Sequence, residues 1–547
     1  MSRFVAPLVL LAACFGSKPE PAEPPAPPRD TLVIGLSSDF ATLNPVVSET
    51  TSDSAILENL LMPTIEADFD CKLTFRPSIA TEWAWAEDGK AITITMRDDL
   101  SWSDGTPLTA HDVKMAYTLA GDPTVGSPRY SYLRHMEPGS PEVTGDHTLV
   151  FRYTHAYDKT TQLAHANLSP VPRHIFESAD RSTLRGHPRS LEPLSNGPWQ
   201  LTTREPSQRI VIEPNPAFAG GEDDAPRLRR VVFRVLPEYT TRLGELRNGG
   251  IDLMEGIEIE DADGLKRFNP ELNIVSRGYR SSEYLAWNLN HPIFKDREVR
   301  RAIAMAVDVQ GLIDNLLTDA QGEPHARRAV STITPELCGA HASDIKPIDL
   351  DIPAARELLA SRGWVDTDGD GVLDKDGKPF RFRLSINSGN KRRHDAAVLI
   401  QDALKSIGIR ADLEVTESNA FFASLRAREF DAAIAGWNAA LFIDPTAVWK
   451  SDPKDGKHEF NFTGYSNPEV DDLIDRGLDT PDPAEAAPIW REMQAKIYED
   501  QPYLFLWWRE ELVAVHERFD SPVIDILSPF RSLNHWDVPA DKVKYKR

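Results

Sequence analysis

The sequence predicts an α/β protein that folds into at least two lobes. A chain of 547 residues, of which 41% are hydrophobic, is too long for a single hydrophobic core. Between residues 351 and 437, segments with the two-residue periodicity of strands alternate with segments of helical periodicity. This alternation is typical of a parallel sheet with crossover helices. No internal repeat is visible, which argues against a solenoid.

The first residues are typical of an export signal. Arg3 precedes the apolar run Phe4–Ala13, which is too short to cross a bilayer but fits the hydrophobic region of a secretory signal. The run ends in Leu-Ala-Ala-Cys, which resembles a bacterial lipobox. We therefore expect residues 1–14 to be a lipoprotein signal that ends at Cys14, the lipidated residue. A plain signal peptide and a buried hydrophobic segment are the alternatives. The proline-rich stretch 15–30 predicts an extended linker.

Several segments before residue 320 predict individual elements. Residues 90–97 alternate as a half-buried strand does. A turn at Asp104–Gly105 precedes a helix for which Thr109 is the expected N-cap, with Asp112 three residues later. Two further strands and a helix are predicted at 207–216, 227–237 and 299–317.

The clearest pattern lies between residues 351 and 437. A short helix is expected after Asp351, with Pro353 in its first turn and Gly363 at its end. In parallel sheets, ligands bind beyond the carboxyl ends of the strands. The loop 435–449 follows the last strand, so it is the first place where we expect a site. The remaining predicted strands and helices cover 378–387, 391–406, 409–415, 418–427 and 430–437.

An aspartate-rich segment, DTDGDGVLDKDG, resembles a calcium-binding loop in part. Asp366, Asp368, Asp370 and Asp374 match the first, third, fifth and ninth positions of an EF-hand loop. Gly377 occupies the twelfth position, where a bidentate glutamate is needed, and a strand is predicted to follow instead of a helix. The pattern therefore favours a tight connection whose Asp and Gly residues accept left-handed turns. A structural calcium site is the weaker alternative.

Charge and cysteine content limit the possible partners. The net charge of −23 argues against a nucleic-acid backbone as a partner. If Cys14 carries lipid, Cys71 and Cys338 remain, and an exported compartment permits a disulfide between them. Two free thiols are the alternative, because the sequence does not fix the distance between them.

The sequence contains no recognisable enzyme motif. There is no GxSxG elbow and no HExxH helix, and the segment that ends in Gly377–Lys378 continues with Pro379 in place of the Ser or Thr of a phosphate-binding loop. The 14 histidines show no spacing typical of metal ligands. We therefore expect no catalytic residue, no cofactor and no metal centre.

The order of several motifs resembles that of the family 5 extracellular solute-binding proteins, which include oligopeptide- and dipeptide-binding proteins of ABC importers. The similarity extends from about residue 31 to residue 540. It rests on the segments SIATEWAWAEDGKAITITMRDDLSWSDGTPLTAHDVKMAY, NGPWQL, RIVIEPNPAFAGG, RLGELRNGGIDLMEGI, YLAWNLNHPIFKDREVRRAIAMAVD, GWVDTDGDGVLDKDGKPFRF and NFTGYSNPEVDDLI.

The resemblance implies a two-lobed periplasmic-binding-protein fold, type II-like and of class C, with an extra subdomain in lobe I. Lobe I would comprise residues 31–285, with the subdomain near 56–185. Lobe II would comprise 286–505, and residues 506–547 would return to lobe I. The chain would cross between the lobes near YLAWNLN and again near PYLFLWWREEL.

The resemblance also implies a function and its partners. The chain would be the lipid-anchored, extracytoplasmic substrate-binding protein of an ABC importer. It would capture a peptide or another small solute as a monomer and deliver it to a permease and ATPase complex. A sensory or chemoreceptor solute-binding protein is the alternative, and an exported hydrolase is a weaker one.

The expected ligand site departs from the family pattern. In peptide binders the strand end typically reads Gly-Trp-x-x-Asp, and the aspartate pairs with the α-amino group of the peptide. Here the segment that begins at Gly436 has alanine in that place, and a buried ammonium without a counter-charge would cost several kcal/mol. Asp444 would either replace the aspartate or serve a turn. We expect ligand contacts at Trp437, Asn438, Ala439, Asp444 and Asn288, and at Trp449 unless it fills the core, which its position favours.

Overall fold

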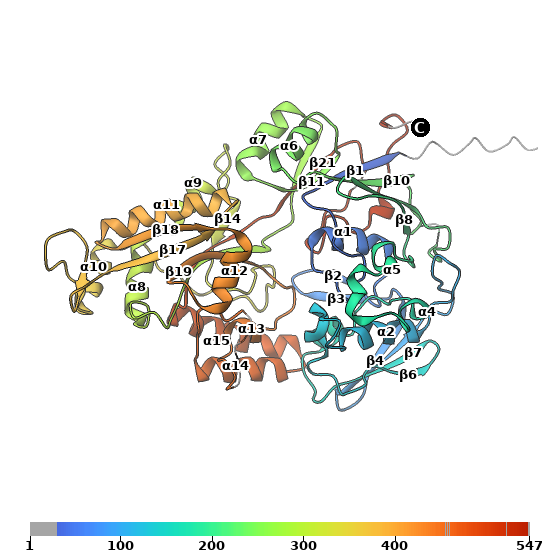
Figure 1. Ribbon diagram of the computed structural model, residues 1–547, viewed down its shortest axis with the longest axis horizontal. Coiled ribbons are helices and arrows are strands. Elements are labelled where there is room, and N and C mark those ends of the chain that lie inside the picture. The colour runs from blue at the N-terminus through green and yellow to red at the C-terminus, as the bar shows by residue number, and fades with distance from the viewer. Residues whose placement is uncertain are drawn as a thin grey trace, which may run out of the picture.

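The computed structural model describes residues 30–544, with the exception of 222, 455, 457, 459 and 521. Cys14, the signal segment and most of the linker lie outside these described residues. The described part of the chain forms two lobes, each built around its own sheet (Figure 1). No helix within it is both long enough and apolar enough to cross a bilayer.

Lobe I contains a seven-stranded sheet in the order β12-β21-β11-β1-β10-β9-β8. The first strand is parallel to β10 and β11, and the other pairings are antiparallel. Helices α6 and α7 lie beside β11 and β21 (Figure 1). The elements are β1 Thr31–Leu36, β8 Trp199–Glu205, β9 Arg209–Pro214, β10 Arg230–Val235, α6 Tyr239–Arg247, β11 Leu253–Ile257, α7 Ile259–Phe268, β12 Leu272–Ser276 and β21 Leu512–His516.

A subdomain of lobe I lies between β1 and β8 in the sequence. Its four-stranded antiparallel sheet has the order β4-β5-β7-β6, and a separate hairpin, β2–β3, precedes it. The predicted strand and the helix after Thr109 are confirmed, and the Thr109 N–H donates to Asp112 at 2.8 Å. The elements are α1 Thr51–Leu60, β2 Glu66–Phe69, β3 Leu73–Arg76, β4 Ala80–Trp85, β5 Ala91–Met96, α2 Ala110–Ala120, η1 Pro128–Leu133, β6 Glu142–Gly145, β7 Thr148–Arg152, α3 Lys159–His165, α4 Arg173–Phe176, η2 Arg181–Gly186 and α5 Pro188–Leu191.

Lobe II contains a six-stranded mixed sheet in the order β14-β20-β13-β19-β17-β18. Strands β17, β18 and β19 are parallel, as the sequence predicts. Strand β13 joins β19 antiparallel, and β20 in turn pairs antiparallel with β13. The elements are β13 Ser281–Trp287, α8 Arg297–Ala306, α9 Val309–Leu316, β14 Ala326–Arg328, α10 Ile352–Ser361, β15 Asp374–Lys375, β16 Lys378–Pro379, β17 Arg381–Asn387, α11 Lys391–Ser406, β18 Arg410–Thr416, α12 Ser418–Ala427, β19 Ala432–Asn438, α13 Thr446–Trp449, α14 Pro468–Asp479, α15 Pro483–Asp500 and β20 Tyr503–Arg509.

The single helix predicted over 299–317 is two helices, α8 and α9. They are separated at Val307–Asp308, where the Asp308 side chain accepts from the Gly311 N–H and caps the second helix. The local capping bond therefore interrupts a continuous apolar pattern.

The chain crosses between the lobes at residues 277–280 and 510–511, and the two crossings lie side by side. The Arg277 N–H donates to the Glu511 carbonyl at 2.9 Å, and the Glu511 N–H donates to the Gly278 carbonyl at 3.3 Å. The boundaries expected at 285 and 505 fall elsewhere, because β13 and β20 pair with each other inside the lobe II sheet.

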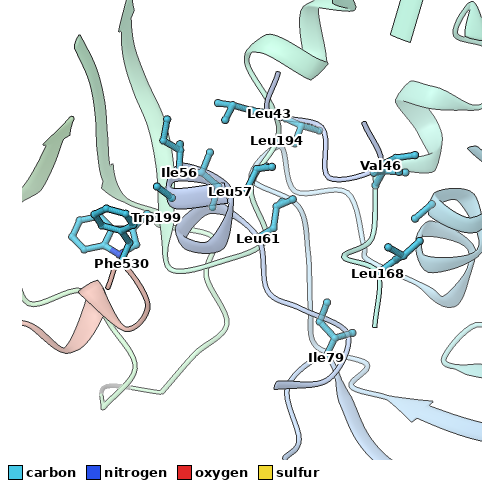
Figure 2. Close-up of a cluster of buried hydrophobic side chains, with 14 of the residues drawn as sticks. Leu43, Val46, Ile56, Leu57, Leu61, Ile79, Leu168, Leu194, Trp199 and Phe530 are labelled. Carbon is cyan, nitrogen blue, oxygen red and sulfur yellow. The ribbon is translucent and has the colours of Figure 1, made fainter. Parts of the chain in front are cut away.

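The hydrophobic core of lobe I is shared by its subdomain and the C-terminal return. Leu57 of α1 and Leu61, directly after that helix, lie in this cluster together with Leu43 and Leu168 (Figure 2). Phe530, from the return segment, packs at the same cluster beside Trp199. Residues that precede α1 in the chain and residues of the C-terminal return therefore pack together around this helix.

Candidate functional site

The loop that follows β19 contacts lobe I. The ring of Phe442 lies 6.1 Å from that of His165 in α3, and the carboxylate of Asp444 lies 3.5 Å from the guanidinium of Arg134. Tyr132 in turn stacks on His165 at 5.2 Å. Burial lowers the pKa of His165 to about 4, so this imidazole is neutral at pH 7. The loop forms the lobe II wall of the contact between the lobes.

Two of the expected ligand residues lie at the start of this wall. Trp437 is half-buried and stacks between Phe462 and Tyr284, at 5.5 and 5.9 Å between ring centroids. Asn438 is exposed, and its amide oxygen accepts from the Ser281 hydroxyl at 2.9 Å. The aromatic stack fixes the indole, and the Ser281 hydroxyl fixes the Asn438 amide oxygen.

Arg280, at the first lobe crossing, connects the wall to lobe I. Its guanidinium donates to the carbonyl of Ala439 at 3.0 Å and to the carbonyl of Ile526 at 2.8 Å. Ala439 itself is buried, and it presents only backbone groups. The loop after β19 and the C-terminal return are therefore held close together.

Asp444 has two structural partners. One carboxylate oxygen accepts from the Thr446 N–H at 3.1 Å, which is the turn role that the Asp-Pro sequence indicates. The other oxygen pairs with Arg134 of lobe I. The carboxylate therefore connects the two lobes.

Asn288 and Trp449 are both buried inside lobe II. Asn288 follows β13 at the end opposite Asn438, and its amide donates to the carbonyls of Arg428 and Phe430. Trp449 is 1% exposed and donates to the Thr332 hydroxyl within the lobe II core. The two side chains brace the fold, and we leave them out of the proposed ligand contacts.

Lobe I contains a cavity of about 770 Å³, and all of its lining residues belong to lobe I. Helix α1, the β2–β3 hairpin and the C-terminal return line it, with Leu57, Glu58 and Leu527 among its residues. Leu527 directly follows Ile526, the partner of Arg280, so the cavity lies next to the loop after β19. None of these lining residues was expected from the sequence. The acidic Glu58 among the apolar residues of α1 was the one feature that indicated a functional carboxyl there.

A charged cluster lies where α11 meets the lobe crossing. Glu283 is 3% exposed and pairs with Arg392 at 3.2 Å and Arg393 at 3.0 Å, while the Trp507 indole donates to it. Burial alone would raise the pKa of Glu283, but the two guanidinium groups outweigh this effect and hold the pKa below its ordinary value. Arg392 also pairs with Glu258 of lobe I at 2.9 Å, so the cluster joins the lobes near their crossing.

The lobes also touch where the start of α3 in lobe I meets the end of α14 in lobe II. The N–H groups of Asp158 and Lys159 donate to the carbonyls of Leu478 and Pro481, at 3.1 and 3.2 Å. Helix α14 accordingly lies against the subdomain at the lower edge of the molecule (Figure 1). The lobes therefore touch here as well as beside their crossings.

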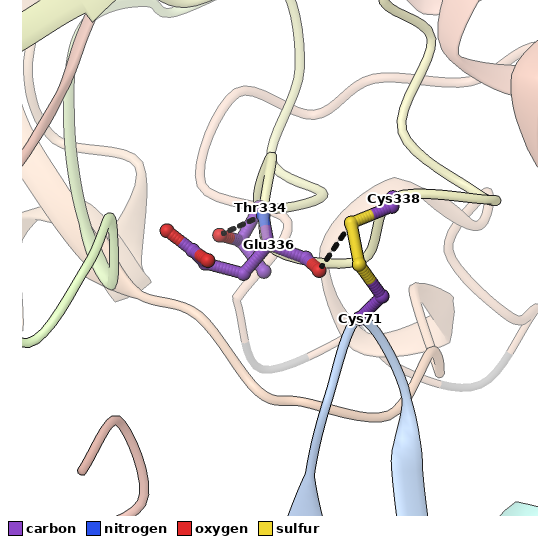
Figure 3. The surroundings of a disulfide bond; sticks show 4 residues. All are labelled: Cys71, Thr334, Glu336 and Cys338. Atoms are coloured by element: carbon purple, nitrogen blue, oxygen red, sulfur yellow. Dashed lines mark hydrogen bonds between the residues drawn. A yellow bond between two sulfur atoms is a disulfide. The ribbon is translucent and has the colours of Figure 1, made fainter.

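A disulfide joins Cys71 to Cys338 and connects the lobes covalently. Cys71 is at the tip of the β2–β3 hairpin, and Cys338 lies in a loop of lobe II (Figure 3). The same loop packs on the first crossing, because the Tyr279 N–H donates to Glu336 at 2.8 Å. Of the two alternatives for these cysteines, the structure contains the bonded one.

The aspartate loop lies at the far end of lobe II, between α10 and β17 (Figure 1). Oxygens of Asp366, Asp368 and Asp374 lie within 4.8 Å of one another, whereas Asp370 is not part of this group. Asp366 accepts from the Gly369 and Gly371 N–H groups, and Asp374 accepts from the Thr367 N–H. The carboxylates cap their own loop, as side chains of a tight turn do.

Comparison with known proteins identifies relatives over almost the whole chain. The family model "Bacterial extracellular solute-binding proteins, family 5 Middle" matches residues 74–458. The oligopeptide-binding protein AppA of Bacillus subtilis is 29% identical over 94% of this chain and 93% of its own length.

Solved structures give the same result for the fold. AppA of Bacillus subtilis in complex with a nonapeptide has a TM-score of 0.77 at 27% identity, with 94% of this chain and 100% of that chain covered. NikZ of Campylobacter jejuni in complex with Ni(L-His) has a TM-score of 0.78 at 21% identity, with 93% and 100% covered. This second likeness concerns the fold alone.

The two lobes and the paired crossings define a two-lobed α/β protein. Because the family model covers most of the sequence, the chain belongs to the bacterial extracellular solute-binding proteins of family 5. The fold expected from the sequence is confirmed.

Proposed function

We propose that this chain is the substrate-binding component of an ABC-type importer, which captures a peptide or another small solute between its lobes. The observation that carries the proposal is the two-lobed arrangement, in which the loop after β19 of lobe II contacts lobe I. A cavity of about 770 Å³ on lobe I supports it. AppA, the relative that covers 94% of this chain, is an oligopeptide-binding protein and supports peptide as the solute class.

The mechanism follows from the contacts between the lobes. A solute in the cleft touches both walls only when the lobes are together, so binding shifts the population toward the closed form. The paired segments 277–280 and 510–511 form the natural hinge, because they alone carry the backbone between the lobes within the described residues. The closed form would dock on a membrane permease and release its cargo there, and lipid on Cys14 would hold it at the membrane surface.

Mass spectrometry of solute released from the purified protein, followed by scattering with and without that solute, tests the proposal. We expect co-purified peptides or another small solute, and a more compact particle when the solute is added back. Equal scattering curves across a broad library of peptides and small solutes would contradict it. Labelling with radioactive palmitate, with Cys14→Ser as the control, tests the lipid anchor.

A further inference from the structure

The β2–β3 hairpin is fixed to lobe I at its base. Arg531 of the C-terminal return pairs with Glu66 at the start of β2, and its guanidinium lies 3.6 Å from the carboxylate of Asp68. Phe75, on the second strand of the hairpin, packs against the hydrophobic core of lobe I. Ion pairs and apolar contacts therefore keep this end of the hairpin on lobe I.

The tip of the same hairpin is attached to lobe II. Phe69 packs against the lobe II core, and the disulfide joins Cys71 to Cys338 (Figure 3). The loop that carries Cys338 is held at the first crossing, where Glu336 accepts from the Tyr279 N–H at 2.8 Å. The hairpin is therefore a link between the lobes in addition to the two backbone crossings.

The disulfide limits how far the lobes separate at this point. The Cα atoms of Cys71 and Cys338 are 5.1 Å apart. Because a disulfide spans at most about 6.8 Å between Cα atoms, the two anchor points gain only about 2 Å before the hairpin or the loop deforms. Once the bond is broken, noncovalent contacts such as that of Phe69 oppose the separation, and such contacts open and close reversibly.

The bond is open to thiol reagents, because Cys71 and Cys338 are both exposed. Exposed disulfides are the class that is labile or regulatory. A dithiol attacks one sulfur as a thiolate, forms a mixed disulfide and displaces the other cysteine as a thiolate. Its second thiol then displaces the first cysteine and closes a cyclic disulfide, so two electrons and two protons pass to the two cysteines. Oxidised glutathione re-forms the bond by the reverse exchange and leaves as two reduced molecules.

We propose that the Cys71–Cys338 disulfide is a redox-sensitive restraint on the opening of the lobes. In the oxidised protein the hairpin keeps the lobes close together, and in the reduced protein they separate farther. The consequence for the solute rests on the proposed function: the oxidised protein loads and releases its cargo more slowly than the reduced protein does. The thiol–disulfide balance of the compartment then sets the rate of solute exchange.

Pulsed electron resonance between gadolinium labels measures the separation of the lobes without any solute. Thr118 of α2 in lobe I and Glu485 of α15 in lobe II are exposed, and labels on non-natural ketone side chains at these positions leave the cysteines untouched. After reduction with dithiothreitol, we expect the distance distribution to extend by more than about 2 Å, the separation that the bond permits. Reoxidation with oxidised glutathione should restore the shorter distances.

Three controls distinguish lobe opening from other effects of the reagent. A label pair at Lys405 and Glu485, both in lobe II, should give the same distribution in oxidised and reduced protein. The double variant Cys71→Ser, Cys338→Ser should show the longer distances with and without dithiothreitol. Lys72→Ala changes an exposed residue at the hairpin tip and leaves the bond in place, so it should behave as the wild type does.

The outcomes separate this inference from the proposed function, because no solute takes part. Unchanged distances between the lobes after complete reduction would overturn the restraint and leave solute binding untouched. A change in the lobe II pair as well would show that the bond stabilises the chain in general, which also contradicts the inference. Iodoacetamide labelling monitors the reduction, and thiols that form only in denaturant would exclude a redox-sensitive role. The wild-type comparison needs no cysteine variant, so it decides the question even if the double variant fails to fold.

Discussion

At the scale of single residues, the environment decides what each candidate side chain does. Trp437 and Trp449 are twelve residues apart, yet one is half-buried between Phe462 and Tyr284 and the other is 1% exposed in the core. From the sequence, Asp444 is a candidate to replace the aspartate that peptide binders have three residues after this tryptophan. In the structure its carboxylate already has partners in its own turn and in lobe I.

We expect Trp437→Ala to weaken binding of the co-purified solute about 10-fold or more, because a large half-buried aromatic side chain is lost from the cleft wall. Val415→Ala, at an exposed apolar residue of β18, is the control. Isothermal titration measures both, and an unchanged dissociation constant for Trp437→Ala would exclude this wall from the site.

Glu58 also predicts a pH dependence of stability. Its pKa is raised from 4.5 to about 8 on folding, so the folded state holds the proton more tightly than the unfolded state. The contribution to the free energy of unfolding is full below pH 4.5 and is lost as the pH rises through about 8, by at most about 1.4 kcal/mol per pH unit.

Urea unfolding at several pH values measures this effect. Glu58→Gln should gain stability relative to the wild type between about pH 5 and pH 8. A constant difference over that range would contradict the raised pKa.

At the scale of elements, helix α1 depends on one buried carboxylate. Asp53 is fully buried and accepts from the N–H groups of Ala41, Thr42, Glu49 and Thr50, while its own N–H donates to the Thr50 hydroxyl. This capping box fixes the start of the helix and the preceding loop together. It thereby positions the wall that carries Glu58.

We expect Asp53→Ala to lower the free energy of unfolding by about 2–4 kcal/mol, because the change removes the cap and leaves buried N–H groups unpaired. Thr51→Ala, at an exposed neighbour, should change it by less than about 0.5 kcal/mol. Denaturant unfolding of the two variants provides the measurement. Similar losses in both would show that the helix does not depend on this cap.

At the scale of the whole molecule, three covalent connections join the lobes. Two are the backbone crossings, and the third is the Cys71–Cys338 disulfide, whose cysteines are 267 residues apart. Phe69, near the tip of the hairpin, also packs on the lobe II core, whereas Phe75 at its base packs on lobe I. The hairpin therefore spans the cleft from one lobe to the other.

We expect the double variant Cys71→Ser, Cys338→Ser to lose about 2–5 kcal/mol of unfolding free energy, because a closed loop of this size restricts the unfolded chain. Its lobes should also open farther without ligand, which a larger radius of gyration in scattering reports. Reduced wild-type protein should behave as the variant does. An identical radius for oxidised and reduced protein would show that the hairpin does not limit opening.

The sequence by itself determined the family, the two-lobed α/β class and most elements of the 351–437 region. Helix α10 begins after Asp351 and ends before Gly363, whose φ of +84° lies in the left-handed region, because capping and turn preferences act within a few residues. The loop after the last parallel strand was likewise found from strand order alone.

Only the tertiary structure decided where the lobes are divided, which cysteines pair and which residue bonds to Glu58. Each of these depends on residues far apart in the sequence, such as Ser281 with Arg509, Cys71 with Cys338, and Glu58 with Ser528. Periodicity reports which face of an element is buried, but it carries no information on which distant element covers that face. The cavity wall on α1 was missed for this reason, because the C-terminal return that completes it lies more than four hundred residues away.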